Sequence, residues 1–156
     1  MQDEVTGDLI FIAQEPQQSL FRISYNGTNL TTLVARSSYG SNTDGDFSVT
    51  KFKSPQGVAK LDSDAILITD TYNDNIRTID LKQKKSGTLR FCGGCGSIDS
   101  PFSVYCMKDS LYIGQYHKIL RFKLDRAVTM STKAPQSISS AILTAIQSKQ
   151  TTFNSN

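Results

Sequence analysis

The sequence of 156 residues contains no tryptophan, a single histidine and only three cysteines. No stretch approaches the roughly 18 consecutive apolar residues of a membrane-spanning helix, so membrane insertion is not expected. An odd number of cysteines does not make a disulfide framework. The net charge of +3 is too small to indicate binding of nucleic acid or anionic membrane by itself. The length is sufficient for one ordinary domain with a hydrophobic core.

The first residues, MQDEVTGDL, are acidic where a secretory signal peptide has a basic end and an apolar core. We therefore expect no export signal in the chain. Two N-glycosylation triplets, at Asn26 and Asn29, give weak support to an exported protein. The compartment stays open between the cytoplasm and, for a piece of an exported parent chain, the extracellular space.

Three segments of the chain share one order of features: residues 9–24, 65–80 and 110–124. Each begins with an apolar run of strand length, which ends on a small residue followed by a hydrogen-bonding one: Gln14, Asp70 or Gln115. A polar turn and a second strand-like segment follow. The intervals between these three residues are 56 and 45 positions. Repeats near this length are typical of propellers and solenoids.

The middle unit divides into four short segments, residues 57–61, 65–69, 76–81 and 88–92, separated by turn residues. The second is apolar at successive positions, which predicts a strand covered on both faces. The third alternates, which predicts one buried and one wetter face. Four-stranded units at this spacing are typical of β-propeller blades.

Four residues are assigned structural roles at the turns: Gln14, Gly57, Asp70 and Gln115. Gly57 follows Pro55 closely and marks a sharp bend into a first strand. Asp70 ends the buried strand, where its carboxylate can accept hydrogen bonds from backbone N–H groups of the turn. A metal-ligand role for Asp70 is the weaker interpretation.

The segment FKSPQGVAKLDSDAILITDTYNDNIRTIDL resembles an NHL repeat, with its aromatic residue, proline-glycine bend, apolar strand and Asp-Thr-x-Asn-x-Arg-Ile-like turn. The connector before it, with Asp44-Gly45, is similar to those of the family. The third unit keeps Ser100-Pro101 but has Ser103 in place of Gly57 and Gln115 in place of Asp70. The resemblance covers roughly residues 7–125 and implies an all-β fold, an incomplete β-propeller of four-stranded NHL-type blades.

The expected organisation is a partial propeller over residues 1–132, with units around 7–35, 52–92 and 100–132, followed by a polar tail over residues 133–156. Residues 127–132 are candidates for the last blade's fourth strand. Ser137 is expected to begin a short amphipathic helix over residues 138–146, and the final ten residues read as disordered. Closed propellers have about four to eight blades, so the missing blades are expected from a longer parent chain or from self-association.

Cys92 and Cys95 form a CxxC motif that, with Cys106 and His117, supplies four potential zinc ligands. The spacing between Cys106 and His117 fits no zinc-finger pattern, and the motif lies in a glycine-rich connector rather than at a helix start. A disulfide between two of the cysteines remains an alternative. We expect no catalytic residue, no metal and no cofactor.

The function expected is that of a non-catalytic scaffold that binds a protein partner through its loops. The candidate surface lies on the connector of residues 36–51 and on the strand turns, and comprises Tyr39, Phe47, Tyr72, Asn73, Tyr116 and His117. RNA binding is the first alternative, with Lys82, Lys84 and Lys85 as phosphate contacts. The resemblance also leaves open a fragment of a propeller enzyme, similar to amidating lyases or gluconolactonases.

Overall fold

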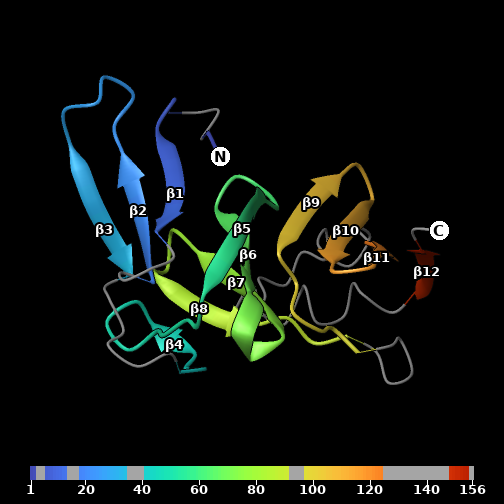
Figure 1. The fold of residues 1–156 in the computed structure, drawn as a ribbon. Coiled ribbons are helices and arrows are strands. Elements are labelled where there is room, and N and C mark those ends of the chain that lie inside the picture. Colours follow the sequence, from blue (N-terminus) through green and yellow to red (C-terminus); the bar gives the residue numbers. More distant parts are fainter. Residues whose placement is uncertain (3–5, 14–17, 35–40, 92–96, 125–147, 155–156) are drawn as a thin grey trace, which may run out of the picture.

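The computed structural model describes residues 1–2, 6–13, 18–34, 41–91, 97–124 and 148–154, and within them the chain is all-β (Figure 1). The first sheet contains β1 (Leu9–Ala13), β2 (Ser19–Ile23) and β3 (Leu30–Val34). The middle sheet contains β4 (Gly45–Asp46), β5 (Pro55–Lys60), β6 (Ala65–Asp70), β7 (Asn75–Asp80) and β8 (Lys85–Thr88). The third contains β9 (Ser103–Met107), β10 (Ser110–Gln115), β11 (Lys118–Lys123) and β12 (Ser148–Asn154). All strand pairs are antiparallel.

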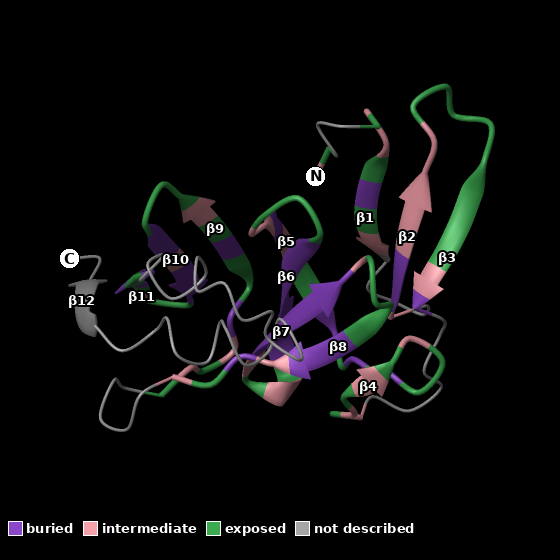
Figure 2. Ribbon diagram, turned by 180° about the vertical axis from the view of Figure 1, so that it is seen from behind, coloured by how far each residue is buried: buried purple, intermediate pink, exposed green. Residues whose placement is uncertain are grey.

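The three sheets stand side by side, and the middle sheet is covered on both faces (Figures 1 and 2). Ile66 and Ile68 of β6 pack into one core with the first sheet, while Leu67 packs into a second core with the third sheet. All six residues of β6 are buried, as the apolar run predicts. The all-β expectation of blade-like sheets in a partial propeller is therefore confirmed.

The expectation of a wetter face on the third strand of the middle unit is wrong. In β7 every residue after Asn75 is buried, including Arg77. Neither face of β7 is wet, because Ile76 packs into the core with the third sheet and Ile79 into the core with the first. The apolar residues of β7 enter the two cores, whereas Arg77 is enclosed by polar groups of the connector.

At matching places in the middle and third sheets, a glycine on one strand lies beside a hydroxyl residue on the next, and the two residue types change places between the sheets. In the middle sheet the hydroxyl of Thr69 accepts a hydrogen bond from the N–H of Gly57 at 2.7 Å. The third sheet has Ser103 and Gly114 at the matching places of β9 and β10. A Cβ atom on Gly57 would lie 3.0 Å from the Cα of Ser103, and one on Gly114 would lie 2.2 Å from the Ser103 hydroxyl oxygen. Each sheet therefore has room for one side chain at this place.

Two boundaries of the middle unit differ from the sequence expectation. The fourth strand is Lys85–Thr88 rather than residues 88–92, so the expected turn at Lys85 belongs to the strand. The connector also contributes β4, whose Gly45 and Asp46 pair with Ser86 and Lys85. Only a few local residues signal such short outer strands, because their stability comes from the strand beside them.

In the described part of the chain, the fourth strand of the third sheet is formed by residues 148–154, which pair with β11. The expectation that the last ten residues are disordered is wrong for this segment. Its polar sequence gives no strand pattern by itself, and the free edge of β11 supplies the hydrogen-bonding partner. The expected helix of residues 138–146, its start at Ser137 and residues 127–132 lie outside the described part of the chain.

The outward faces of the first and third sheets carry exposed apolar side chains. On the first sheet the rings of Phe11 and Phe21 stack with their centroids 5.5 Å apart, and Leu9 is 48% exposed. On the third sheet Tyr105 and Ile119 are exposed. Faces of this kind usually mark a protein interface.

We expect the isolated 156-residue chain to associate through these faces. Light scattering after size exclusion should give a mass above the 17.2 kDa of one chain. Phe11→Lys should shift the population toward the single chain, because a charge would be buried in the contact. A stable, monodisperse single chain for the unchanged protein would contradict this expectation.

Candidate functional site

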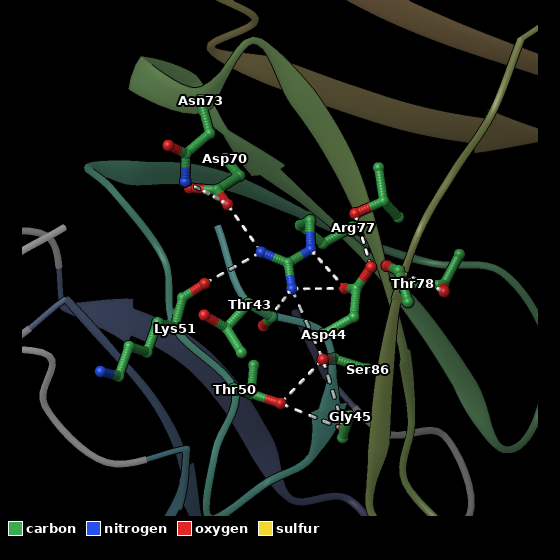
Figure 3. A network of polar contacts seen from close by, with 12 residues as sticks. Thr43, Asp44, Gly45, Thr50, Lys51, Asp70, Asn73, Arg77, Thr78 and Ser86 are labelled. Carbon is green, nitrogen blue, oxygen red and sulfur yellow. Dashed lines mark hydrogen bonds and ion pairs between the residues drawn. The ribbon is translucent and has the colours of Figure 1, made fainter. Parts of the chain in front are cut away.

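Arg77 is the centre of a buried polar network that ties the connector to the middle sheet (Figure 3). Its Nη1 donates to Asp70 Oδ2 and to the carbonyl oxygen of Lys51, both at 2.9 Å. Its Nη2 donates to the carbonyl oxygen of Thr43 at 2.7 Å, and its Nε donates to Asp44 Oδ1 at 3.0 Å. The guanidinium therefore fixes the path of the chain before β5.

The Asp70 carboxylate accepts from three donors and lies fully buried. The N–H of Lys53 donates to Oδ1 at 2.6 Å, and the side chains of Asn73 and Arg77 donate to Oδ2, each at 2.9 Å. Burial raises the pKa of the Asp70 carboxyl above its ordinary value, and these hydrogen bonds act against that rise. The donors come from before β5 and from β7 as well as from the turn, so Asp70 joins three segments.

The turns of one sheet also hold the start of the next sheet. The hydroxyl of Thr71 donates to the carbonyl oxygen of Pro101 at 2.7 Å, and the N–H of Ser100 donates to Asp74 Oδ1 at 2.7 Å. The N–H of Ser54 donates in the same way to Gln18 Oε1 at 3.3 Å. Ser54 and Ser100 both have positive φ, 49° and 43°. These contacts fix the edge where the strand turns of one sheet meet the start of the next sheet, which we call the rim.

At this rim two adjoining depressions form what we call the rim groove. The first has a volume of about 430 Å³ and is lined by Gln56, Thr71, Tyr72, Ser100, Phe102 and Tyr116. The second has a volume of about 460 Å³ and is lined by Asp99, Ser100, Gln115, Tyr116, His117 and Lys118. They share Ser100 and Tyr116. The groove therefore runs from the β6–β7 turn of the middle sheet to the β10–β11 turn of the third.

Three aromatic side chains around the first depression are exposed. Tyr72 is 62% exposed, Phe102 42% and Tyr116 83%. The ring of His117 lies edge-on to that of Tyr116 with the centroids 5.2 Å apart. Of the residues that the sequence marked as an interaction surface, the structure brings together Tyr72, Tyr116 and His117.

The other residues of that predicted surface lie elsewhere. Asn73 donates to Asp70 Oδ2 and, at 3.1 Å, to the carbonyl oxygen of Ser41, so its amide holds the turn. Phe47 is half-buried against the core between the first and middle sheets. Tyr39 lies outside the described residues, as does Gln14. The later part of the connector, which was expected to be a recognition loop, is held by Arg77 through Thr43, Asp44 and Lys51.

Lys82, Lys84 and Lys85 are exposed around the β7–β8 turn. Consecutive turns of an antiparallel sheet lie at opposite ends of their shared strand, so β7 separates these lysines from Tyr72. Lys85 Nζ lies 4.0 Å from Asp46 Oδ1. The basic cluster and the rim groove are thus two separate surfaces.

A larger depression of about 590 Å³ lies beside Asp44 and Asp74. Its carboxylates are engaged, since Asp44 binds Arg77 and Thr88, and Asp74 accepts from the N–H of Ser100. Within the described ranges, no group of three or more His, Cys, Asp or Glu side chains could hold a metal ion. Cys92 and Cys95 lie outside those ranges, and Cys106 is half-buried beside the core between the middle and third sheets.

The sequence does not reveal the importance of two residues, Arg77 of the buried network and Phe102 of the rim groove. The alternating pattern gives no sign that Arg77 is buried, although it is the one charged side chain among Ile76, Thr78 and Ile79. No local pattern marks Phe102, because its nearness to Tyr72 comes from the packing of two sheets. The matching positions of Tyr72 and Tyr116 in the repeat were a usable signal.

In the described part of the chain, no helix has the length and apolar character needed to cross a membrane.

Comparison with known proteins supports the fold and leaves the family open. No protein-family model matches the chain, and no curated protein matches it. Three similar solved structures are a Bacteroides thetaiotaomicron protein of unknown function (TM-score 0.64, 13% identity), an auxiliary nutrient binding protein from the same organism (0.56, 15%) and a nidogen/laminin complex (0.58, 15%). They match 73%, 72% and 78% of this chain, which covers 31%, 33% and 41% of theirs. The chain thus shares an all-β, propeller-like fold with proteins of which it spans about a third.

Proposed function

We propose that the chain is an arc of NHL-type blades that acts as a non-catalytic binding scaffold and holds a peptide segment of a protein partner in the rim groove. The observation that carries this proposal is the exposure of Tyr72, Phe102 and Tyr116 around one depression. Exposed aromatic side chains beside a recess are the residue types that contribute most at protein interfaces.

The rim groove has the rigid support that a recognition surface needs. Its two walls are turns of neighbouring sheets, joined by the bonds from Thr71 to Pro101 and from Ser100 to Asp74. Asp70 holds the β6–β7 turn in place by accepting hydrogen bonds from Asn73 of the turn and from Arg77 of β7. A preorganised surface loses little conformational entropy on binding. Among the similar structures, one is named as a nutrient binding protein and one as a protein complex, which is consistent with a binding role.

RNA binding through Lys82, Lys84 and Lys85 is the less favoured candidate. Asp46 lies near this cluster, and Asp80 sits at its turn, where its Oδ1 accepts from the N–H groups of Lys82 and Gln83. Both carboxylates lower the positive potential that phosphate binding requires. The aromatic groove that single-stranded bases would need lies at the other end of β7.

The proposal can be tested by selecting peptides on the immobilised protein from a random phage-displayed library. We expect Tyr72→Ser and Tyr116→Ser each to weaken binding of the enriched peptides by at least about tenfold, because buried interface aromatics contribute about 1.4 kcal/mol or more. Tyr25→Ser is the matched control. Tyr25 is 78% exposed, but it lies on the first sheet near Asp8, away from the groove.

Peptides that bind equally well to the Tyr116→Ser protein would contradict the proposal. So would RNA binding that weakens steeply with salt and is lost when Lys82, Lys84 and Lys85 are replaced by glutamine. In that case the expected slope is about 0.7 log units per log unit of salt for each phosphate contact. Thermal unfolding of each variant shows whether the fold is retained.

A further inference from the structure

Gln115 stands at the end of β10, where Asp70 stands at the end of β6. Asp70 lies opposite Asn75 in the last pair before the β6–β7 turn, and Gln115 lies opposite Lys118 in the last pair before the β10–β11 turn. The two side chains therefore occupy the same place in successive sheets. The groups around the two side chains differ.

The two side chains that donate to Asp70, those of Arg77 and Asn73, have no counterparts around Gln115. Arg77 lies opposite Ile68 in β7, and the matching residue in β11, opposite Ile113, is Leu120. The β6–β7 turn has the four residues 71–74, whereas the β10–β11 turn has only residues 116 and 117, so no counterpart of Asn73 exists. The position is ion-paired in the middle sheet, where Asp70 and Arg77 stand, and uncharged in the third, where Gln115 and Leu120 stand.

The carboxamide of Gln115 is left buried with both polar atoms unpaired. The residue is only 4% exposed, and neither Oε1 nor Nε2 has a hydrogen-bond partner among the described residues. Leaving such a group unsatisfied is costly, and buried polar groups in folded proteins are nearly always bonded. An apolar side chain of similar length would remove that cost. A glutamine at this place therefore calls for a partner that the described residues do not supply.

Gln115 lies where a bound molecule can supply that partner. It lines the second depression of the rim groove together with Asp99, Ser100, Tyr116, His117 and Lys118. Tyr116 and His117, which line the same depression, are exposed at its edge. Through Ser100 and Tyr116 this depression joins the aromatic one, so a single extended ligand can reach both.

We propose that Gln115 is the recognition group for a carboxamide, either a backbone peptide unit or an Asn or Gln side chain, in the peptide held by the rim groove. One acceptor and one donor side by side on Gln115 match the donor and acceptor of such a group. A carboxylate has no donor for Oε1, and an aliphatic group has neither partner. The inference rests on the proposed function and adds to it the chemical class that the second depression selects.

The experiment uses the full chain labelled with ¹⁵N and three small probes: propionamide for a side-chain amide, N-methylacetamide for a backbone unit, and propionate as the charged control. The side-chain NH₂ signal of Gln115, assigned by its loss in Gln115→Met, should shift and saturate with at least one amide. Signals of residues 99, 100 and 116–118 should move with it. Propionate should bind at least about tenfold more weakly, because it leaves Oε1 unpaired.

Gln115→Met keeps the side-chain length and removes both polar atoms. Its thermal midpoint should equal or exceed that of the unchanged protein, and amide binding should fall at least about tenfold. The matched control Gln83→Met alters an exposed glutamine of the β7–β8 turn, outside the rim groove, and should leave amide binding at the Gln115 subsite unchanged. Failure of both amides to shift the Gln115 signal, or binding that persists in Gln115→Met, would overturn the inference.

This outcome is separable from that of the proposed function. If peptides selected on the protein lose affinity in Tyr116→Ser but not in Gln115→Met, the scaffold proposal stands and the carboxamide subsite is wrong. If the amides bind at Gln115 but no peptide depends on Tyr72 or Tyr116, the subsite stands and the peptide-binding proposal fails.

Discussion

Replacing Arg77 with alanine is expected to lower the free energy of unfolding by about 3–5 kcal/mol, the usual cost of breaking a buried ion pair from one side. Asp70 would remain buried with its charge uncompensated, and the carbonyl oxygens of Thr43 and Lys51 would lose a donor. Urea unfolding followed by far-ultraviolet circular dichroism measures the change. This loss is a large share of the stability of an ordinary domain.

The third sheet supplies the control for this prediction, because Gln115 and Leu120 occupy the places of Asp70 and Arg77. A double variant, Asp70→Gln with Arg77→Leu, should be clearly more stable than Arg77→Ala, since it removes the buried charge along with its partner. A loss of less than about 1 kcal/mol in Arg77→Ala would show that the network does not hold the connector.

Introducing a threonine at Gly114 is expected to cost about 3 kcal/mol, at the upper end for overpacking a close contact. A Cβ atom there would approach the Ser103 hydroxyl oxygen to 2.2 Å, and the threonine side chain is larger still. Adding Ser103→Gly recreates the arrangement of Gly57 and Thr69 in the middle sheet. The pair Gly114→Thr with Ser103→Gly should therefore recover most of the lost stability.

Urea unfolding of both single variants and the pair gives the coupling energy between the two positions. Because Gly114 and Ser103 lie opposite each other in the β9–β10 pair, we expect a favourable coupling of at least about 1 kcal/mol. If the stability losses of the two single variants simply add in the double variant, steric space does not explain why the glycine and the hydroxyl residue change places between the sheets.

The parts of the fold that the sequence could predict are those with local causes. β6 is an unbroken apolar run that ends at a polar turn, and the structure buries all six of its residues. The repeat of that pattern predicts three blade-like units, and the described part of the chain forms three sheets. Tyr72 and Tyr116 stand at matching turns, and they meet at one depression.

The parts that could not be predicted depend on residues far apart in the chain. Arg77 is buried because Asp44, 33 positions earlier, turns toward it from the connector. Phe102 joins the groove because the third sheet packs against the middle one. The strand Ser148–Asn154 exists because β11 offers a free edge, a condition that no local pattern in SKQTTFN reveals.

Equivalent positions of the middle and third sheets hold different pairs of residues. Asp70 with Arg77 and Gln115 with Leu120 are alternative pairs at one place, and Gly57 with Thr69 and Ser103 with Gly114 are another such set. In the first set Arg77 compensates the charge of Asp70, and in the second a glycine makes room for a hydroxyl side chain. The carboxamide of Gln115 has no such compensation among the described residues. That imbalance points to the rim as the site of recognition rather than the lysine turn.

The most direct test of the account is a chemical-shift map of the ¹⁵N-labelled chain titrated with a peptide selected on it. The account predicts that the perturbed backbone signals concentrate on residues 71–72, 99–102 and 115–118, the two walls of the rim groove. Perturbations centred on residues 82–85, or on the outward face of the first sheet around residues 9–11, would contradict it.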